Sequence, residues 1–270
     1  MQLYADLRVL TARPTPEEEA QAPHHLFGVA DAGEAWSVGR WLRAALPVLQ
    51  DIATRRREAI VVGGTGLYFR ALTEGLAEAP DVPPEIRAAA AADFESLGEA
   101  AFRERLAGVD PAAATRIASG DRQRLTRAWE VWRASGEALS NLQARTEPAL
   151  AAGRWRGAVI DLAREVLYAR CDARLVAMFE GGAIEEADRL LARGLDRDLP
   201  AMKALGLREI AAWRRGETSR EAALAAAQQE TRRYAKRQAT WFRNQTPHWP
   251  KITAAEAVDQ WGQFLASGSP

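Results

Sequence analysis

The chain of 270 residues has little of what disulfides, zinc sites and histidine-based catalysis depend on. Its one cysteine, Cys171, excludes an internal disulfide and suits a reducing compartment. With three histidines and one cysteine, a Cys/His zinc cluster is not expected, and no Ser-His-Asp or Cys-His triad is proposed. Two of them, His24 and His25, follow a proline and are interpreted as structural residues. No metal-ligating residues are expected.

Long apolar runs and a net charge are also missing. No apolar run approaches the ~20 residues that span a bilayer, and the N-terminus lacks the charged-then-apolar layout of a signal peptide. Lys and Arg together number 36, as do Asp and Glu, so a polyanion could be held only by a local patch. We expect a cytoplasmic monomer without a membrane partner.

A glycine turn is the first feature that suggests a ligand. The stretch AIVVGGTGLYFRAL, residues 59–72, predicts a short buried strand, a turn and the start of a helix. Gly63, Gly64 and Gly66 would let a ligand approach the backbone, and Thr65 adds a hydroxyl. Amides at a helix start favour an anion. The alternative is a tight strand-to-helix turn without a ligand, and the chain has no G-x-x-x-x-G-K-[ST] phosphate loop to accompany it.

The order of the predicted elements indicates an α/β core with a parallel sheet. Strands are expected at Ala59–Val62 and Trp155–Leu162, where apolar residues run together. Residues 80–150 are rich in alanine, with apolar positions at helical intervals, and predict an inserted helical domain. Residues 1–79 and 151–270 would then form the α/β core with its C-terminal helices.

Helix boundaries follow from prolines and capping residues. Residues 1–25 predict a loop with some extended structure because of their prolines. A helix should follow from Ser37, its cap, and Pro47 would kink or divide it. The last long helix should begin at a Thr218/Glu221 capping box and end near Asn244.

This last helix carries basic residues, and no acidic residue occurs from 231 to 255. The basic and polar positions that share adjacent stripes of a helix are Arg232, Lys236, Arg243, Arg233, Arg237 and Thr240. Tyr234, Trp241 and Phe242 would point into the core. Such a face suits a nucleic-acid backbone, and the alternative is a solubilising surface.

Two further groups of arginines could hold phosphates. In GDRQRLTRAWEVW, Gln123 and Arg127 share a helix face with other arginines nearby, although a salt-bridged surface is the simpler interpretation. Arg170 and Arg174 are spaced by four residues after the second predicted strand, where parallel sheets bind ligands. Pairing with nearby acidic residues is the alternative there.

Taken in order, seven stretches resemble the tRNA dimethylallyltransferase (tRNA isopentenyltransferase) family: MQLY, TARP, PHHL, VGGTGLYFRAL, DRQRLTRAWEV, GLREI and AKRQATWFR. The resemblance implies a P-loop-kinase-like, nucleotide-binding-like α/β core with an inserted helical domain. It implies transfer of a dimethylallyl group from dimethylallyl diphosphate to the exocyclic amine of the adenosine 3′-adjacent to the anticodon in tRNA. Mg²⁺ would assist, and the anticodon stem-loop would be the partner.

The resemblance also implies roles for individual residues. Thr65 and Arg174 match catalytic residues at the diphosphate, beside the three glycines of the turn. Met1 and Gln2 match the end of a D-S-x-x motif that holds the flipped base. The positions that match tRNA contacts are Met1, Gln2, Arg87, Gln123, Arg124, Leu125, Thr126, Arg127, Lys203, Ala204, Leu205, Gly206, Leu207, Arg208, Lys236, Arg237, Gln238, Thr240 and Arg243.

The chain departs from the family pattern at its start. The family's G-P-T-A-S-G-K-[ST] loop and the aspartate of D-S-x-x, its general base, would both precede Met1. We expect them upstream in the reading frame, with Met1 an internal start. This chain should then have an incomplete sheet, low stability and weak diphosphate binding. Attack by the amine should slow by ~10²–10⁴.

Two other functions remain open. A tRNA-binding remnant without catalysis would keep the basic helices and bind tRNA without transferring the group. A small-molecule kinase of the same P-loop type is disfavoured by the missing loop and by the basic stretch 231–255.

Overall fold

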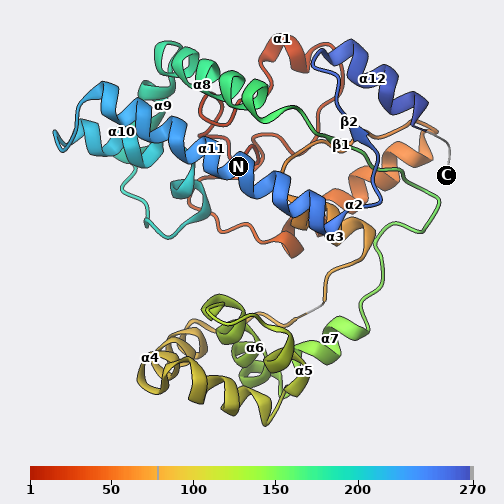
Figure 1. Cartoon of the computed structure of the whole chain (residues 1–270), viewed down its shortest axis with the longest axis vertical. Helices are drawn as coiled ribbons and strands as arrows, with labels where there is room; N and C mark the ends of the chain where they lie inside the picture. The colour runs from red at the N-terminus through yellow and green to blue at the C-terminus, as the bar shows by residue number, and fades with distance from the viewer. Residues whose placement is uncertain (78, 268–270) are drawn as a thin grey trace. The chain divides into compact units, whose positions relative to one another are not determined.

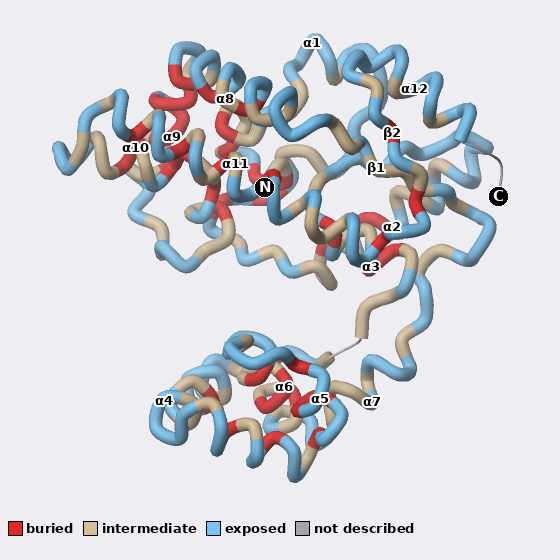
Figure 2. The backbone as a smooth tube through the Cα atoms, viewed as in Figure 1, coloured by how far each residue is buried: buried red, intermediate tan, exposed pale blue. Residues whose placement is uncertain are grey.

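The computed structural model describes residues 1–77 and 79–267. The chain divides into two compact units, one formed by Met1–Tyr68 with Gly153–Pro270 and the other by Phe69–Ala152. Each unit has its own group of buried residues (Figure 2). The helical insertion predicted at 80–150 lies within the second unit.

The second unit is helical, as the sequence predicts (Figure 1). Its helices are α4 (Pro84–Ala107), α5 (Pro111–Arg116), α6 (Arg122–Ser135) and α7 (Leu139–Ala144). Gly98, at φ 73°, interrupts α4. This lets the second half of α4 turn independently of the first, because glycine adopts positive φ without steric cost. The core of this unit consists of Ala90, Phe102, Leu106, Ala113, Ala114, Ile117, Leu125, Ala128 and Trp129.

A buried carboxylate, Asp110, joins two helices of this unit. Its Oδ1 accepts the Ala113 N–H at 2.9 Å as the N-cap of α5, and its Oδ2 accepts the Ser140 N–H of α7 at 3.0 Å. Burial acts to raise the pKa of the Asp110 carboxyl, but the hydrogen bonds from Ser140 and Ala113 outweigh it, so this pKa lies below its ordinary value of 3.8.

Helices from both ends of the sequence make up most of the first unit. They are α1 (Pro16–Glu19), α2 (Val38–Thr54), α3 (Gly66–Thr73, which begins here), α8 (Arg164–Glu180), α9 (Ala183–Ala192), η1 (Pro200–Lys203, a 3-10 helix), α10 (Leu207–Arg214), α11 (Arg220–Gln245) and α12 (Ala257–Ala266). Ser37 caps α2 as predicted, with its Oγ 3.1 Å from the Arg40 nitrogen. Pro47 lies inside α2 and does not divide it.

The start of α11 differs from the prediction. Ser219, not Thr218, is the N-cap, and its Oγ accepts the Ala222 N–H at 3.1 Å. The predicted capping box is therefore wrong by one residue, because serine and threonine both cap well and the sequence offers both side by side. The helix ends at Gln245, one residue beyond the prediction.

The sheet is smaller than predicted. Strand β1 (Val159–Ile160) pairs in parallel with β2 (Lys251–Ile252), and Ile160 lies opposite Ile252 (Figure 1). The strand predicted at Trp155–Leu162 is confirmed only for its two residues Val159–Ile160. Strand β2 was not predicted, because two residues are too few to show the alternation of a strand. Residues Ala59–Val62 form no strand, and Ile60 and Val62 are 68% and 69% exposed. The prediction of a buried strand there is wrong for this structure, because no described segment pairs with it.

The N-terminal segment forms turns held to α9 by Glu186. This carboxylate is 4% exposed and accepts the N–H groups of Arg8, Val9 and Leu10 at 2.7, 2.8 and 2.9 Å. These three charge-assisted hydrogen bonds satisfy backbone donors that the turns themselves leave without partners. The same segment contains a parallel bridge between Tyr4 and Ala30.

Replacing Asp110 should loosen α5 within the intact protein. We expect Asp110→Ala to destabilise this helix by about 1–3 kcal/mol, because the cap and the Ser140 hydrogen bond are both lost. Hydrogen exchange at the amides of residues 112–117 of the full chain should accelerate. Because the folded pKa is depressed, the carboxylate stabilises above the ordinary pKa of 3.8, and this contribution disappears as pH falls through the folded value. Unchanged exchange in the variant at pH 7 would contradict this role.

Candidate active site

The glycine turn packs directly against α11. The Gln238 side-chain amide donates to the Gly64 carbonyl at 2.9 Å. A Cβ on Gly64 would lie 1.8 Å from the Gln238 Nε2, and one on Gly66 would lie 2.1 Å from the Trp241 ring. At Gly63 nothing lies within 4 Å of such a Cβ. The approach of α11 therefore accounts for two of the three glycines without any ligand.

Thr65 stands free between these glycines. It is exposed, and its hydroxyl makes no hydrogen bond with a residue that the structure describes. Its carbonyl accepts the Tyr68 N–H at 2.9 Å, and the Tyr68 ring stacks on Trp41 at 4.4 Å. The first turn of α3 is thus fixed, with the Thr65 hydroxyl at a helix start where an anion is favoured.

The two arginines of α8 have different surroundings. Arg170 donates to the Ala255 carbonyl at 2.9 Å and pairs with Glu256 at 3.2 Å. Arg174 is exposed and forms no ion pair with a described residue. The charge-pairing alternative therefore holds for Arg170, while the guanidinium of Arg174 is available to an anion.

Helix α11 holds both α8 and the glycine turn. Asp172 of α8 forms two hydrogen bonds with Arg232, at 2.8 and 2.7 Å. Gln238, which binds Gly64, is six residues further along α11, about 9 Å of helix rise. The turn that carries Thr65 and the helix that carries Arg174 are thus supported by neighbouring segments of one helix. Their catalytic roles remain predictions.

The basic face of α11 is narrower than the sequence suggests. Arg232 and Arg233 pair with Asp172 and Glu230. Lys236, Arg237 and Arg243 are exposed. The prediction that Tyr234 points into the core is wrong, since this ring is 36% exposed and the Arg237 guanidinium lies 5.6 Å from its centre. Thr240 is half-buried on the same helix, and Trp241 packs on Phe242 at 5.1 Å.

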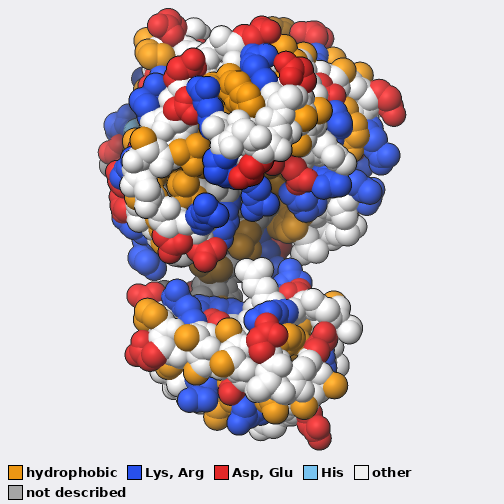
Figure 3. Space-filling model, turned by 90° about the vertical axis from the view of Figure 1, so that its left-hand side faces the viewer, with side chains coloured by type: hydrophobic (Ala, Val, Ile, Leu, Met, Phe, Trp, Pro, Cys, Tyr) orange, Lys and Arg blue, Asp and Glu red, His pale blue; other side chains and the backbone are white. Residues whose placement is uncertain are grey.

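The segment Gln123–Arg127 lies in the first turns of α6. Arg122 pairs with Glu95, Arg124 with Asp121 at 3.1 Å and Arg127 with Glu130 at 3.6 Å. Leu125 is fully buried and offers no surface, Thr126 bonds back to its own helix, and Gln123 is exposed. On the face of the molecule shown in Figure 3, basic and acidic side chains are interspersed. Exposed pairs of this kind are weak and can exchange for phosphates.

The remaining predicted contacts differ in how much they present to solvent. In the segment 203–208, Ala204, Gly206 and Leu207 are buried, whereas Lys203 and Arg208 are exposed. Gly206, at φ 89°, begins α10 against Leu10. Of the other predicted contacts, Met1 and Arg87 are exposed and Leu205 is half-buried. The side-chain amide of Gln2 donates to the carbonyls of Thr11 and Ala12.

Two side chains in AWEVW are absent from the sequence-based prediction. Trp129 and Trp132, three residues apart on α6, stack on each other and line a cavity. Their spacing of three residues on a predicted helix was the sequence signal that could have found them.

Among the described residues, no three His, Cys, Asp or Glu side chains come together as a metal ion requires. No described helix combines the length and the apolar character that a membrane span needs.

Comparison with known proteins identifies the family. Residues 2–245 match the family model described as IPP transferase, and the chain belongs to this family. It is 65% identical over 266 residues to the tRNA dimethylallyltransferase of Phenylobacterium zucineum, covering 98% of this chain and 86% of that one. A second tRNA dimethylallyltransferase, from Caulobacter, is 60% identical and covers 93% of this chain and 82% of its own length.

Solved structures share the fold. The tRNA isopentenylpyrophosphate transferase of Bacillus halodurans is 31% identical, with a TM-score of 0.64, and the match covers 98% of this chain and 84% of that one. A eukaryotic dimethylallyltransferase, described as acting on tRNA, gives a TM-score of 0.78 at 23% identity, over 99% of this chain and 68% of that one. This second likeness concerns the fold alone.

The contact between the glycine turn and α11 can be tested with matched substitutions. Gly66→Ala should lower the free energy of unfolding by about 1–3 kcal/mol, because its Cβ would overlap the Trp241 ring. Gly63→Ala, with nothing within 4 Å, should change it by less than about 0.5 kcal/mol. Urea unfolding followed by circular dichroism measures both. Equal stability of the two variants would rule out this packing.

Proposed function

We propose that this chain transfers a dimethylallyl group from dimethylallyl diphosphate to the exocyclic amine of the adenosine 3′-adjacent to the anticodon in tRNA. The observation that carries the proposal is the family match over residues 2–245, together with relatives at 60–65% identity named tRNA dimethylallyltransferase. The free Thr65 hydroxyl and the unpaired Arg174 supply groups that suit a diphosphate.

The reaction requires groups that stabilise negative charge, and the glycine turn and α8 expose such groups. The adenosine nitrogen attacks the first carbon of the dimethylallyl group, the bond from that carbon to the diphosphate oxygen breaks, and the amine releases a proton to water. Negative charge grows on the leaving oxygen. The Thr65 hydroxyl, the nearby amides at the start of α3 and the Arg174 guanidinium would stabilise this charge.

The RNA would lie on the exposed cations. Lys236, Arg237 and Arg243 of α11 meet no acidic partner among the described residues and can neutralise phosphates of the anticodon stem-loop. The target adenosine must leave its stack to reach the diphosphate site, as bases do in other enzymes that modify them.

The fold class belongs to the proposal as well. We assign the core to a P-loop-kinase-like architecture whose parallel sheet is represented here by β1 and β2. Ile60, Val62 and Ile160 are 68%, 69% and 57% exposed, whereas the strands of a parallel sheet are ordinarily buried on both faces. They offer an apolar surface against which further strands would pack.

The rate of this chain and its need for magnesium remain predictions. A diphosphate held by Thr65 and Arg174 without a phosphate loop should bind weakly, and we expect slow transfer by this chain. Mg²⁺ takes most of its ligands from phosphates and water in many phosphate sites. None of the proposed steps depends on it.

Substitution of the two anion-binding residues tests the proposal. We expect Thr65→Ala and Arg174→Gln each to lower the rate of prenyl transfer about 10²–10³-fold, because each removes a donor that acts on the leaving oxygen. The measurement is single-turnover transfer of labelled dimethylallyl to an anticodon stem-loop, with enzyme in excess.

The matched control is Arg170→Gln, which removes the same charge one turn away from a side chain already paired with Glu256. Its transfer rate should stay within about two-fold of the unaltered chain. Equal losses in Arg170→Gln and Arg174→Gln would refute the assignment of Arg174. Binding of the stem-loop without any transfer by the unaltered chain would favour the non-catalytic alternative.

A further inference from the structure

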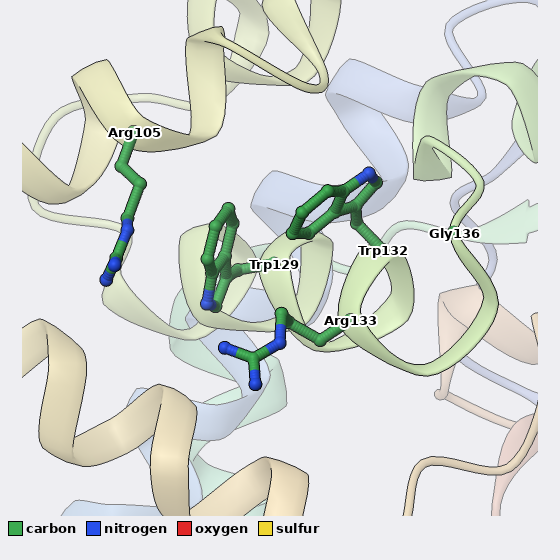
Figure 4. Close-up of a pocket in the computed structure, with 5 residues that line it drawn as sticks. All are labelled: Arg105, Trp129, Trp132, Arg133 and Gly136. Carbon is green, nitrogen blue, oxygen red and sulfur yellow. The ribbon is translucent and has the colours of Figure 1, made fainter.

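An open cavity of about 440 Å³ lies at the surface of the second unit. It is lined by Arg105 of α4, by Trp129, Trp132 and Arg133 of α6, and by Gly136 at the end of α6 (Figure 4). Its size is that of a small-molecule pocket. None of its residues belongs to the contacts assigned above.

The rings of Trp129 and Trp132 form an aromatic wall of the cavity. Their rings stack with centroids 4.8 Å apart and planes inclined by 30°. The Arg105 guanidinium lies 5.2 Å from the centre of the Trp129 ring, which is 5% exposed. Trp129 is thus covered by its neighbours, whereas the half-buried Trp132 can offer a ring face to a ligand.

The polar groups of the cavity are almost all donors. The buried Nε1 of Trp129 has no hydrogen-bond partner among the described residues, and an indole N–H can only donate. Arg133 is exposed and forms no ion pair with a described residue. Arg105 pairs with Asp93 at 3.1 Å, so one acidic group offsets part of the positive charge. Together these donors favour a ligand with a negatively charged hydrogen-bond acceptor.

Arg133 and Trp129, with its unpaired nitrogen, line the same cavity. In the view of Figure 4 the guanidinium of Arg133 is drawn on the side of Trp129 that carries the indole nitrogen. Because Arg133 is exposed and held by no acidic partner among the described residues, its guanidinium is free to turn toward an anion bound in the cavity.

We propose that this cavity binds one unpaired nucleotide, with its phosphate on Arg133, Arg105 and the Trp129 N–H and its base stacked on Trp132. A guanidinium group can donate two parallel hydrogen bonds to a phosphate. Any of the four bases can stack on an aromatic ring. The assignment of this nucleotide to the RNA substrate, outside the site of transfer, rests on the proposed function. A free mononucleotide has the same chemistry, and the experiment separates the two sources.

The test uses the full chain and an anticodon stem-loop that carries 2-aminopurine at one unpaired position at a time. Stacking on an indole quenches this fluorescent base, so one position should be quenched by the unaltered chain. Trp132→Leu and Arg133→Gln should abolish that quenching and weaken stem-loop binding about five-fold or more. Arg145→Gln, which removes an exposed arginine of the same unit outside the cavity, should change binding less than two-fold.

Binding is measured without dimethylallyl diphosphate, so its result does not depend on whether the chain transfers the group. Arg133 is exposed, and its variant tests the site even if Trp132→Leu unfolds the unit. Unchanged quenching and affinity in Arg133→Gln would overturn the proposal. Adenosine monophosphate binding that responds to these substitutions, with stem-loop binding unaffected, would overturn the RNA assignment.

Discussion

The close approach of α11 to the glycine turn is the contact on which the candidate active site depends. Gln238 and Trp241 occupy the space that side chains at Gly64 and Gly66 would need. Through Arg232 and Asp172 the same helix also fixes α8. Thr65 and Arg174 are thereby carried by segments that both contact α11, and transition-state stabilisation by fixed donors requires such support.

Polar contacts hold the two sequence segments of the first unit together. Glu186 of α9 binds three N–H groups of residues 8–10, and Arg193 bridges Asp6 at 2.6 Å and Asp31 at 2.7 Å. These contacts join segments more than 150 residues apart without a strand ladder. In the second unit the Asp110 carboxylate likewise joins two segments, because it accepts backbone N–H groups of α5 and α7. Turns without regular hydrogen bonds need such carboxylates to satisfy their donors.

Local patterns predicted the helices well and the sheet poorly. The alanine-rich stretch 80–150, the Ser37 cap and the extent of α11 followed from periodicity and capping chemistry, which act over a few residues. The strand expected at 59–62 did not form, because pairing depends on a partner elsewhere that no local pattern supplies. The two-residue strand β2 was too short for any period to reveal.

The sequence by itself determined the family, since seven motifs in order resembled it and the family match over residues 2–245 confirms that resemblance. It also determined which residues were candidates for the diphosphate and the RNA. Only the tertiary structure decided which of them are free. Arg170 and Arg232 are paired, Leu125 is buried, and Arg174 and Thr65 remain exposed. The reason is that an ion pair or a stacked ring is formed by residues far apart in the chain, and their meeting is set by packing and not by spacing.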